Sequence, residues 1–571
     1  MKEAIARWWR DGHWAEWLWQ GDPWSFTHLS FWGFFFAVLL IQSKLEQRKA
    51  ARNAFLFLAS LWFYWKTSGW FFTLLLATTV MGFFVGGRIH RPSSRGVQQG
   101  WLGLGVGLSL AFLLFFKYAY FFSESFEALT GMQVALRNPF AGLANAVFQT
   151  GFDADRIVLP IGISFFTFQS ISYVVDIYRG EVEPAENLVD YGFFVSFFPQ
   201  LVAGPIVRAK DFMPQLRRPS VVSHAAFGMA LFWILNGLMK KVWLGDGLAL
   251  MLVDRVFANP TSYTPLENVW ALYGYSLQVY ADFSGYTDIA MGVALLLGFH
   301  LPQNFNSPYK AQHLGDFWRR WHMSLSGWLR DYLYIPMGGN RQGSLFTWIA
   351  LAFVLFFLML LMPSLGGWMI AAGIGCLWMA LGIQFPRLGR WTVTTFNLML
   401  TMLIGGLWHG ASWNFVVWGG LNGVGLVVAK FWRRINPFKG RAPWLGILLT
   451  FHFVTLTRVW FRTSSTANWE DLGGAHDLWS EWLTANDMLM AMSAPMNWAL
   501  LADLVFAYAT PLILLGTGMT IHWLPERWKR RYRLSFAKSS KVVQGFVCLV
   551  VAGFLWERLS TGSAPFIYFQ F

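Results

Sequence analysis

The sequence predicts an all-α protein that crosses a membrane several times. Hydrophobic residues make up 55% of the 571 residues, charged residues make up 13%, and the mean hydropathy is +0.41. Soluble domains carry about 25% charged residues, and a deficit is expected where the surface faces lipid, because charge is expensive there. The 34 tryptophans agree with this class, since tryptophan favours the headgroup level of a bilayer.

Apolar runs of about 20 residues, the length that crosses a hydrocarbon core, locate the helices. The clear candidates are residues 29–43, 101–122, 346–364, 367–385, 396–408, 413–431, 444–461, 499–517 and 542–557. Residues 53–87 form a longer run broken at Lys66–Gly69, which is typical of a helical hairpin. Region 157–300 holds further segments interrupted by glycine and proline. We therefore expect a dozen or more membrane helices, some of them incomplete.

The net charge of +14 does not indicate nucleic-acid binding, because it is spread over short runs between apolar segments. Basic loops beside membrane spans mark the cytoplasmic side, and such loops lie at 44–52, 88–95, 430–441 and 527–541. The segment 463–498 has acidic residues but no Lys or Arg, so we expect 462–498 to be a periplasmic loop. The two cysteines, Cys376 and Cys548, are too few for a disulfide framework or a cysteine-based metal site.

The positions of the basic loops conflict with the number of predicted crossings in one region. If residues 157–178 and 189–206 both cross the membrane, the basic run Arg208–Arg218 lies on the wrong side. One of the two segments is therefore predicted to be re-entrant. Such partial spans are tolerated where they are buried in protein or line a cavity.

Residues 1–28 form an N-terminal segment in which tryptophans alternate with charged residues. This pattern predicts an interfacial helix lying on the membrane, and a disordered tail is the alternative. Residues 29–571 then form the transmembrane domain.

The first chemical candidate is His409, a single ionisable residue in the apolar stretch NLMLTMLIGGLWHGASWNFVVWG (397–419). An ionisable residue inside a span is a functional candidate by default, and neutral imidazole can take a proton from a hydroxyl. The neighbouring Gly405, Gly406 and Gly410 would let a backbone or ligand approach closely. A histidine held by hydrogen bonds in a helix bundle fits the pattern equally well.

The second candidate is the polar stretch 303–340, which lies between apolar regions and is rich in aromatic residues. Its basic side chains could grip phosphates, and its tryptophans could stack on an adenine or flank a pantetheine chain. The residues concerned are Asn304, Asn306, Lys310, Asp316, Trp318, Arg319, Arg320, Trp321 and His322. The alternative is a basic cytoplasmic loop at the headgroups.

The third candidate is the pair Asp282 and Asp288 in QVYADFSGYTD (278–288). They could orient a histidine or pair with the arginines of 303–340, and a buried ion pair holding a broken helix is an equal alternative. The adjacent pair Lys240 and Lys241 is interpreted as snorkelling to the interface.

These stretches resemble the bacterial branch of the membrane-bound O-acyltransferases (MBOAT), in particular the members that O-acetylate alginate. The resemblance rests on LPIGISFFTFQSISYVVDIYRG (159–180), FFPQLVAGPIVR (197–208), YADFSGYTDIAMG (280–292), GGLWHGASWNFVVWG (405–419), FIYFQF (566–571) and the long stretch 304–341. An extra apolar hairpin at 345–394 and the segment 1–28 depart from the family pattern.

The resemblance implies a ring of tilted helices with re-entrant segments and a central channel in the bacterial inner membrane. It implies that His409 and His322 are the catalytic histidines. The donor would be a cytoplasmic thioester, acetyl-CoA or an acylated carrier, with no permanently bound cofactor and no metal.

The acetyl group would pass to an extracytoplasmic polysaccharide, through a periplasmic esterase-like partner. Lys310, Arg319 and Arg320 would hold the donor, while Asp282, Asp288 or Asn414 would orient a histidine. The alternatives are transfer of D-alanyl or another acyl group from a carrier protein, and transport of an ion or lipid-linked saccharide.

Overall fold

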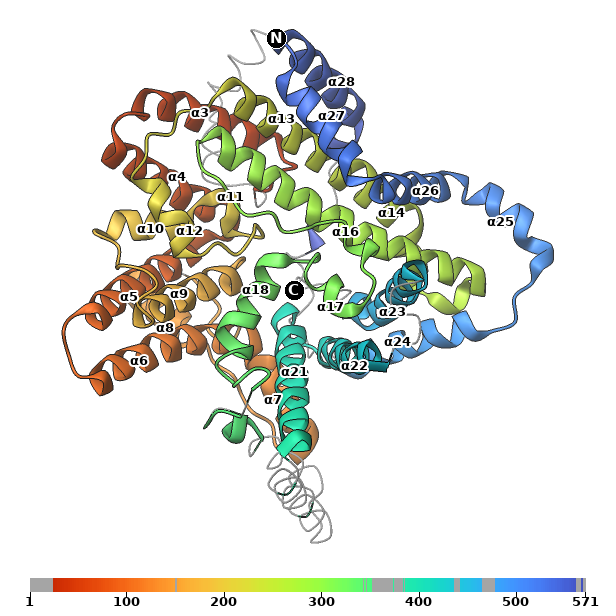
Figure 1. Ribbon diagram of the computed structural model, residues 1–571, viewed down its shortest axis with the longest axis horizontal. Helices are drawn as coiled ribbons and strands as arrows, with labels where there is room; N and C mark the ends of the chain where they lie inside the picture. Colours follow the sequence, from red (N-terminus) through yellow and green to blue (C-terminus); the bar gives the residue numbers. More distant parts are fainter. Residues whose placement is uncertain are drawn as a thin grey trace.

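A computed structural model gives the arrangement of the helices (Figure 1). It describes residues 24–148, 151–341, 343–345, 347–351, 373, 384, 386–435, 442–464, 478–560 and 566–567. These residues form helices joined by turns and loops, and no β-strand occurs among them. The protein is therefore an all-α polytopic membrane protein, as its composition predicts.

The helices follow one another in three groups. The N-terminal group is α3 (Leu29–Leu45), α4 (Lys49–Ser68), α5 (Phe72–His90), α6 (Arg95–Leu113), α7 (Ala119–Thr130), α8 (Pro139–Phe148), α9 (Ile163–Tyr178), α10 (Leu188–Ser196), α11 (Phe198–Leu201) and α12 (Ala209–Leu216). The central group is α13 (His224–Leu238), α14 (Asp246–Leu248), α15 (Asp254–Ala258), α16 (Pro265–Leu296), α17 (Leu314–Phe317) and α18 (Met323–Leu329). The C-terminal group is α21 (Pro386–His409), α22 (Trp413–Ile435), α23 (Pro443–Thr463), α24 (Leu478–Ser493), α25 (Leu501–Ala507), α26 (Ala509–Trp523), α27 (Glu526–Lys538) and α28 (Lys541–Ser560).

Short helical pieces of other geometry connect them. Four are 3₁₀ turns, η1 (Gly69–Phe71), η5 (Pro260–Ser262), η6 (Pro308–Lys310) and η8 (Trp498–Leu500). Four are π-helical, η2 (Leu114–Tyr118), η3 (Met239–Gly245), η4 (Ala249–Val253) and η7 (Arg330–Tyr334). Because π-helical turns are rare and frequent at functional sites, η2 is considered again below.

Six helical runs among the described residues are long and apolar enough to cross a membrane: Lys49–His90, Arg95–Thr130, His224–Ala258, Gly389–His409, Trp413–Ile435 and Pro443–Thr463. Two bent pairs raise the number to at most eight. This is fewer than the dozen predicted from the apolar runs. Two of the predicted runs, 346–364 and 367–385, lie wholly or mainly outside the described residues. Within the described residues, apolar segments of region 157–300 fold into short helices that are covered by protein.

Region 157–216 illustrates this. Helix α9 has 16 residues, α10 has nine and α11 has four, and most of their side chains are buried. At 1.5 Å per residue, α10 and α11 are too short to span a core of about 30 Å. The segment predicted as a second crossing is thus two short helices packed inside the protein. The 53–87 run is broken where predicted, at Gly69 with φ of 59°, and α10 packs against both of its arms.

Helix α16 crosses the centre of the molecule, with α13 alongside it (Figure 1). It has 32 residues and begins with a capping box in which Thr264 and Glu267 bond reciprocally. Glycines allow its close contact with α13: a Cβ on Gly285 would lie 2.7 Å from the carbonyl oxygen of Gly237. Small residues let membrane helices approach in this way.

Three predicted features lie wholly or mainly outside the described residues. They are the interfacial helix within 1–28, the apolar hairpin at 345–394, and the first half of the 462–498 loop.

Candidate active site

His409 is the last residue of α21, and its side chain is 3% exposed. Aromatic rings surround its imidazole: the centroids of Trp408 and Trp418 lie 5.1 Å away, and that of Phe461 lies 5.2 Å away. These rings come from α21, α22 and α23. The sequence places a histidine in an apolar run, and the fold encloses it where three helices meet.

Glycines bring α21 and α22 together at this point. A Cβ on Gly406 would lie 2.3 Å from the Phe415 carbonyl oxygen, and one on Gly410 would lie 2.2 Å from the Phe415 ring. Cβ atoms do not approach other atoms so closely, so neither position has room for a side chain. The close approach expected of these glycines is therefore that of a neighbouring helix.

Lys117 stabilises the end of the helix that carries His409. Its ammonium donates to the carbonyl oxygens of Trp408 at 2.7 Å and His409 at 3.2 Å, and to the Ser164 hydroxyl at 3.4 Å. Tyr118 donates to the Leu407 carbonyl at 2.8 Å. The last carbonyls of a helix lack partners within it, and a cation there is favourable. Both residues belong to the π-helical segment η2.

His322 precedes α18 in a left-handed conformation, with φ of 43°, and its side chain is fully buried. Asn304 Oδ1 accepts from the Ser324 backbone N–H at 3.1 Å and lies 3.2 Å from His322 Nδ1. Because a backbone N–H can only donate, the Asn304 oxygen faces this way, and Nδ1 of His322 carries a proton. In the neutral ring, Nε2 is then the acceptor.

The two histidines lie close together although they come from separate segments of the chain. Their ring centroids are 6.5 Å apart, and Trp408 contacts both, at 5.8 Å from His322 and 5.1 Å from His409. Phe283 of α16 packs edge-on against His322 at 4.7 Å. The fold thus brings the two residues predicted to be catalytic into one buried aromatic cluster.

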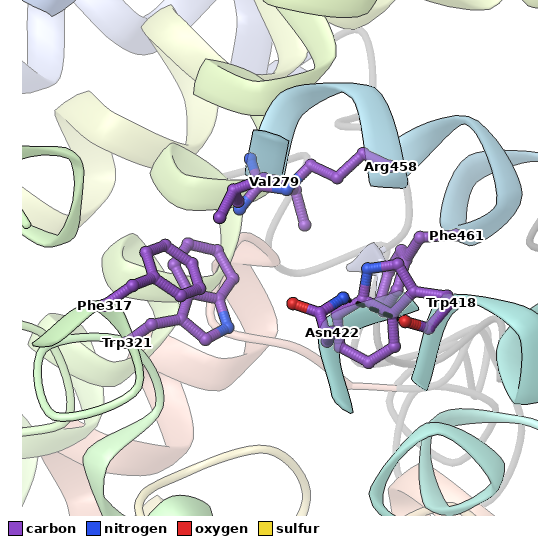
Figure 2. Close-up of a pocket in the computed structure, with 8 residues that line it drawn as sticks. Val279, Phe317, Trp321, Trp418, Asn422, Arg458 and Phe461 are labelled. Atoms are coloured by element: carbon purple, nitrogen blue, oxygen red, sulfur yellow. Dashed lines mark hydrogen bonds between the residues drawn. The ribbon is translucent and has the colours of Figure 1, made fainter. Parts of the chain in front are cut away.

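A small cavity adjoins this cluster (Figure 2). It is lined by Val279, Phe317, Trp321, Trp418, Asn422, Val454, Arg458 and Phe461. Trp418 and Phe461 also contact His409, so they form a wall shared with the histidine. The lining is aromatic and aliphatic except for one amide and one guanidinium, the composition of a pocket for an organic ligand.

Arg458 supplies the positive group of the cavity. It is 4% exposed, donates to the Tyr309 hydroxyl at 2.6 Å and the Ser276 carbonyl at 2.8 Å, and lies over the Trp321 ring at 4.7 Å. The sequence indicates only that Arg458 could form a polar contact within its span. The available signal was an arginine inside an apolar span.

The residues predicted to hold a donor lie in several settings. Trp321 lines the cavity, while Trp318 packs edge-on against Trp418 with ring centroids 5.8 Å apart. Asn304 holds His322 and Ser324, and is fully buried. Asn304 is thus part of the histidine cluster.

The remaining donor-binding candidates lie nearer the surface. Arg320 pairs with Asp316 at 3.1 Å and donates to the Asn306 carbonyl at 3.3 Å. Arg319 is exposed, and Lys310 donates to the Leu524 carbonyl at 2.7 Å. Asp316 therefore neutralises part of the basic stretch.

Asp282 and Asp288 pair with lysines and with neither the histidines nor the arginines of 303–340. Asp282 lies 2.5 Å from Lys241, and Asp288 lies 2.7 Å from Lys240. Interpreting the lysines as a snorkelling pair was wrong, because Lys241 is 4% exposed and also pairs with Asp246 at 2.8 Å. Asp282 of α16 and Asp246 of α14 compensate the charge of Lys241 inside the protein.

Asn414 is the last predicted supporting residue. Its amide donates to the Thr463 hydroxyl at 3.0 Å and the Glu481 carbonyl at 2.9 Å, so it joins α22 to α23 and α24. The neighbouring Ser412 donates to the Glu481 carboxyl group. The asparagine fixes the helix that follows His409 and does not bond to either histidine.

The helical membrane fold agrees with what the chain is similar to. Residues 185–361 match the membrane-bound O-acyltransferase family, MBOAT. The chain is 36% identical over 546 residues to a probable alginate O-acetylase of Azotobacter vinelandii, covering 91% of this chain and 95% of that protein. It is 38% identical over 430 residues to a probable alginate O-acetylase of Pseudomonas aeruginosa, covering 72% and 67%.

A third relative is the peptidoglycan O-acetyltransferase of Helicobacter pylori, 32% identical over 469 residues, which covers 77% of this chain and 76% of that protein. The protein is thus a membrane-embedded acyl-transfer enzyme. It belongs to the membrane-bound O-acyltransferase family, and it is a multi-pass O-acyltransferase.

Proposed function

We propose that this enzyme moves an acetyl group from a cytoplasmic thioester, acetyl-CoA or an acylated carrier, to a hydroxyl of an extracytoplasmic polysaccharide, in the bacterial inner membrane. The observation that carries the proposal is the buried pair His322 and His409, whose ring centroids lie 6.5 Å apart beside an aromatic cavity. The acceptor class is supported by the relatives, whose names give alginate and peptidoglycan as acetylated polymers.

The reaction needs one proton acceptor. His409 takes the proton from the attacking hydroxyl, whose oxygen bonds to the thioester carbonyl carbon. The carbon–sulfur bond then breaks, and the thiolate receives the same proton from His409. An acetyl ester and a free thiol result, and no other reactant is consumed. His322 presents Nε2 to the same cluster because Asn304 holds its Nδ1–H.

The surroundings suit this chemistry. A thioester is already activated, so the protein mainly supplies positioning and a base. The cavity wall that Trp418 and Phe461 share with His409 gives the acyl end of a donor a dry approach. Passage to a distant polymer is assigned to a periplasmic esterase-like partner, which receives the acetyl group as an ester.

The test is acetyl transfer from labelled acetyl-CoA by the purified enzyme in nanodiscs, with its partner and a polysaccharide acceptor. A general base contributes about 10²–10⁴ in rate, so His409→Ala and His322→Ala should each lower transfer by at least a hundredfold. The control is His300→Ala, a substitution of an exposed histidine. Full transfer by His409→Ala refutes the mechanism.

Two further arms separate the alternatives. A D-alanyl carrier protein used faster than acetyl-CoA would identify D-alanyl transfer instead. Flux of an ion or lipid-linked saccharide into proteoliposomes, with no thioester consumed, would identify a transporter.

A further inference from the structure

Two lysines from distant parts of the chain meet at the elbow between α26 and α27. Lys310, in η6, donates to the carbonyl oxygen of Leu524 at 2.7 Å. Lys529, in α27, donates to the carbonyl oxygen of His522 at 2.7 Å and to the Ser307 hydroxyl at 2.9 Å. Both ammonium groups therefore converge on the end of α26 and on the residues that surround η6.

The elbow has more positive than negative charge. Within the described part of the chain, neither Lys310 nor Lys529 forms an ion pair, whereas Arg320 nearby is neutralised by Asp316. Glu526, which is exposed, is the carboxylate that acts on Lys310 from α27, and burial together with Arg320 holds the pKa of Lys310 below its usual value. Two ammonium groups that share one exposed carboxylate, Glu526, are stabilised further by a bound anion.

Each ammonium retains hydrogen-bonding capacity for such an anion. An ammonium has three donors, of which Lys310 uses one and Lys529 two in the bonds above. Ser307 adjoins them in a left-handed conformation, with φ of 44°. Strained residues of this kind are held in place by surrounding structure and cluster at binding sites.

The elbow is connected to the cavity through Tyr309. The Tyr309 backbone N–H donates to His522 Nε2 at 3.2 Å, and its hydroxyl accepts from Arg458 at 2.6 Å. Arg458 lines the cavity together with Trp418 and Phe461, the two rings that also contact His409. Contacts thus connect the lysines to the aromatic cavity, and the cavity to the histidine. A thioester donor has three parts in the same order: a phosphate, an uncharged arm and the thioester.

We infer that Lys310 and Lys529 form a phosphate site that holds the anionic end of the thioester donor while its arm enters the cavity. This inference rests on the proposed function. The phosphate belongs either to a nucleotide, as in acetyl-CoA, or to the phosphopantetheine of an acylated carrier. Lysine suits this role as a point charge for phosphate.

The experiment compares donors with and without phosphate in nanodiscs of neutral phosphatidylcholine. The donors are acetyl-CoA, S-acetyl-phosphopantetheine and S-acetyl-pantetheine, and the variants are Lys310→Gln, Lys529→Gln and the exposed control Lys541→Gln. Lys310→Gln and Lys529→Gln should each raise KM about tenfold for the phosphorylated donors, as expected on losing a charged hydrogen bond. KM for S-acetyl-pantetheine should be unchanged, and Lys529→Arg should restore most of the affinity for acetyl-CoA.

Comparing the two phosphorylated donors shows which phosphate the lysines bind. A defect with acetyl-CoA alone places the nucleotide phosphates at the lysines, and a defect with both places the phosphopantetheine phosphate there. Equal losses with all three donors would overturn the inference, because the lysines would then act through the fold. A defect that occurs only when anionic lipid is added would overturn it too, since the anion would be a lipid headgroup.

Binding of unacylated CoA, measured by calorimetry on the same nanodiscs, keeps the two proposals apart. If the wild type transfers no acetyl group yet binds CoA, and the glutamine variants bind it about tenfold more weakly, the proposed function fails and the phosphate site stands. If CoA binding is the same in the variants and the wild type, the phosphate site is refuted.

Discussion

Lys117 donates a hydrogen bond from its ammonium to the backbone carbonyl oxygen of His409, at 3.2 Å. A second bond, at 2.7 Å, reaches the carbonyl of Trp408. The lysine comes from the π-helical segment between α6 and α7, whereas His409 ends α21. A buried cation therefore fixes the backbone of the candidate base from another part of the chain.

Replacement of this lysine should disturb catalysis more than folding. Lys117→Met keeps the aliphatic volume but leaves two carbonyls without their donor, a loss of about 1.5–3 kcal/mol for bonds to a charged group. We expect the acetyl-transfer rate to fall at least tenfold in a protein that still elutes as a single species. The exposed control Lys44→Met should have wild-type activity. Wild-type transfer by Lys117→Met would show that His409 does not depend on this contact.

Asn304 should set the tautomer of His322. Its side-chain oxygen holds Nδ1 of the histidine and the Ser324 N–H together. Asn304→Leu is similar in size but removes the acceptor, so the ring can adopt the other tautomer and orientation. We expect kcat to fall by about tenfold to a hundredfold, by analogy with other removed orienting groups, with KM for the donor nearly unchanged. An increase in KM alone would instead identify Asn304 as a donor-binding residue.

Much of the fold could be predicted because hydrophobicity and length are local properties. The all-α membrane class, the break at Gly69 and the candidate histidines all follow from short stretches of sequence. The number of spans could not be predicted in the same way. Apolar helices such as α10 are buried by neighbouring protein, and composition alone does not distinguish them from helices that face lipid.

Contacts between residues that lie far apart in the sequence could not be predicted either. Asp282 pairs with Lys241 because α16 packs against η3, and no local pattern in the sequence reveals that contact. Lys529 lies among several other basic residues of α27, and nothing in the sequence distinguishes it from them. Lys117 is different: it is a lysine within the apolar stretch 101–122, and an isolated charge inside a span is a readable signal.

Asp331 should make the stability of the protein depend on pH. It lies 2.6 Å from Arg208 and 2.6 Å from Arg330, and its side chain is 17% exposed. Burial alone would raise its pKa, but hydrogen bonds from Arg330 and Arg208 outweigh burial and hold the pKa below its usual value of 3.8. The stabilisation is therefore complete above pH 3.8 and is lost as the pH falls through the lower folded-state pKa.

The corresponding substitution is Asp331→Asn. At neutral pH it should lower the free energy of unfolding by about 1–3 kcal/mol, the cost of removing a charged hydrogen-bond partner. The difference from the wild type should shrink as the pH falls below 3.8 in thermal denaturation series. Asp487→Asn, which replaces an exposed carboxylate, is the control. A difference that stays constant down to the lowest pH would contradict the ion-pair explanation.

Gly406 should tolerate no side chain. An added Cβ would lie 2.3 Å from the Phe415 carbonyl and 3.0 Å from Gly419 Cα, so α21 and α22 would have to separate. Overpacking of this kind costs about 1–3 kcal/mol, and we expect Gly406→Ala to lower both the melting temperature and the transfer rate. Gly420→Ala is the matched control, because its Cβ meets only Leu403 at 3.5 Å and alanine favours a helix. Equal melting temperatures would show that the two helices can separate without cost.

The cavity can be tested by filling it. Val454 is 3% exposed and lines the small cavity between Trp321 and Trp418, so a phenylalanine there would fill the cavity and press on its walls. If a thioester arm passes through this space, Val454→Phe should raise KM for the donor at least tenfold, while overpacking lowers the free energy of unfolding by about 1–3 kcal/mol. Val428→Phe, at a position 58% exposed on α22, adds the same ring where no cavity is filled, and it should leave KM unchanged. Steady-state kinetics on both variants decide the question, because an unaltered KM in Val454→Phe means that the donor reaches His409 by another route.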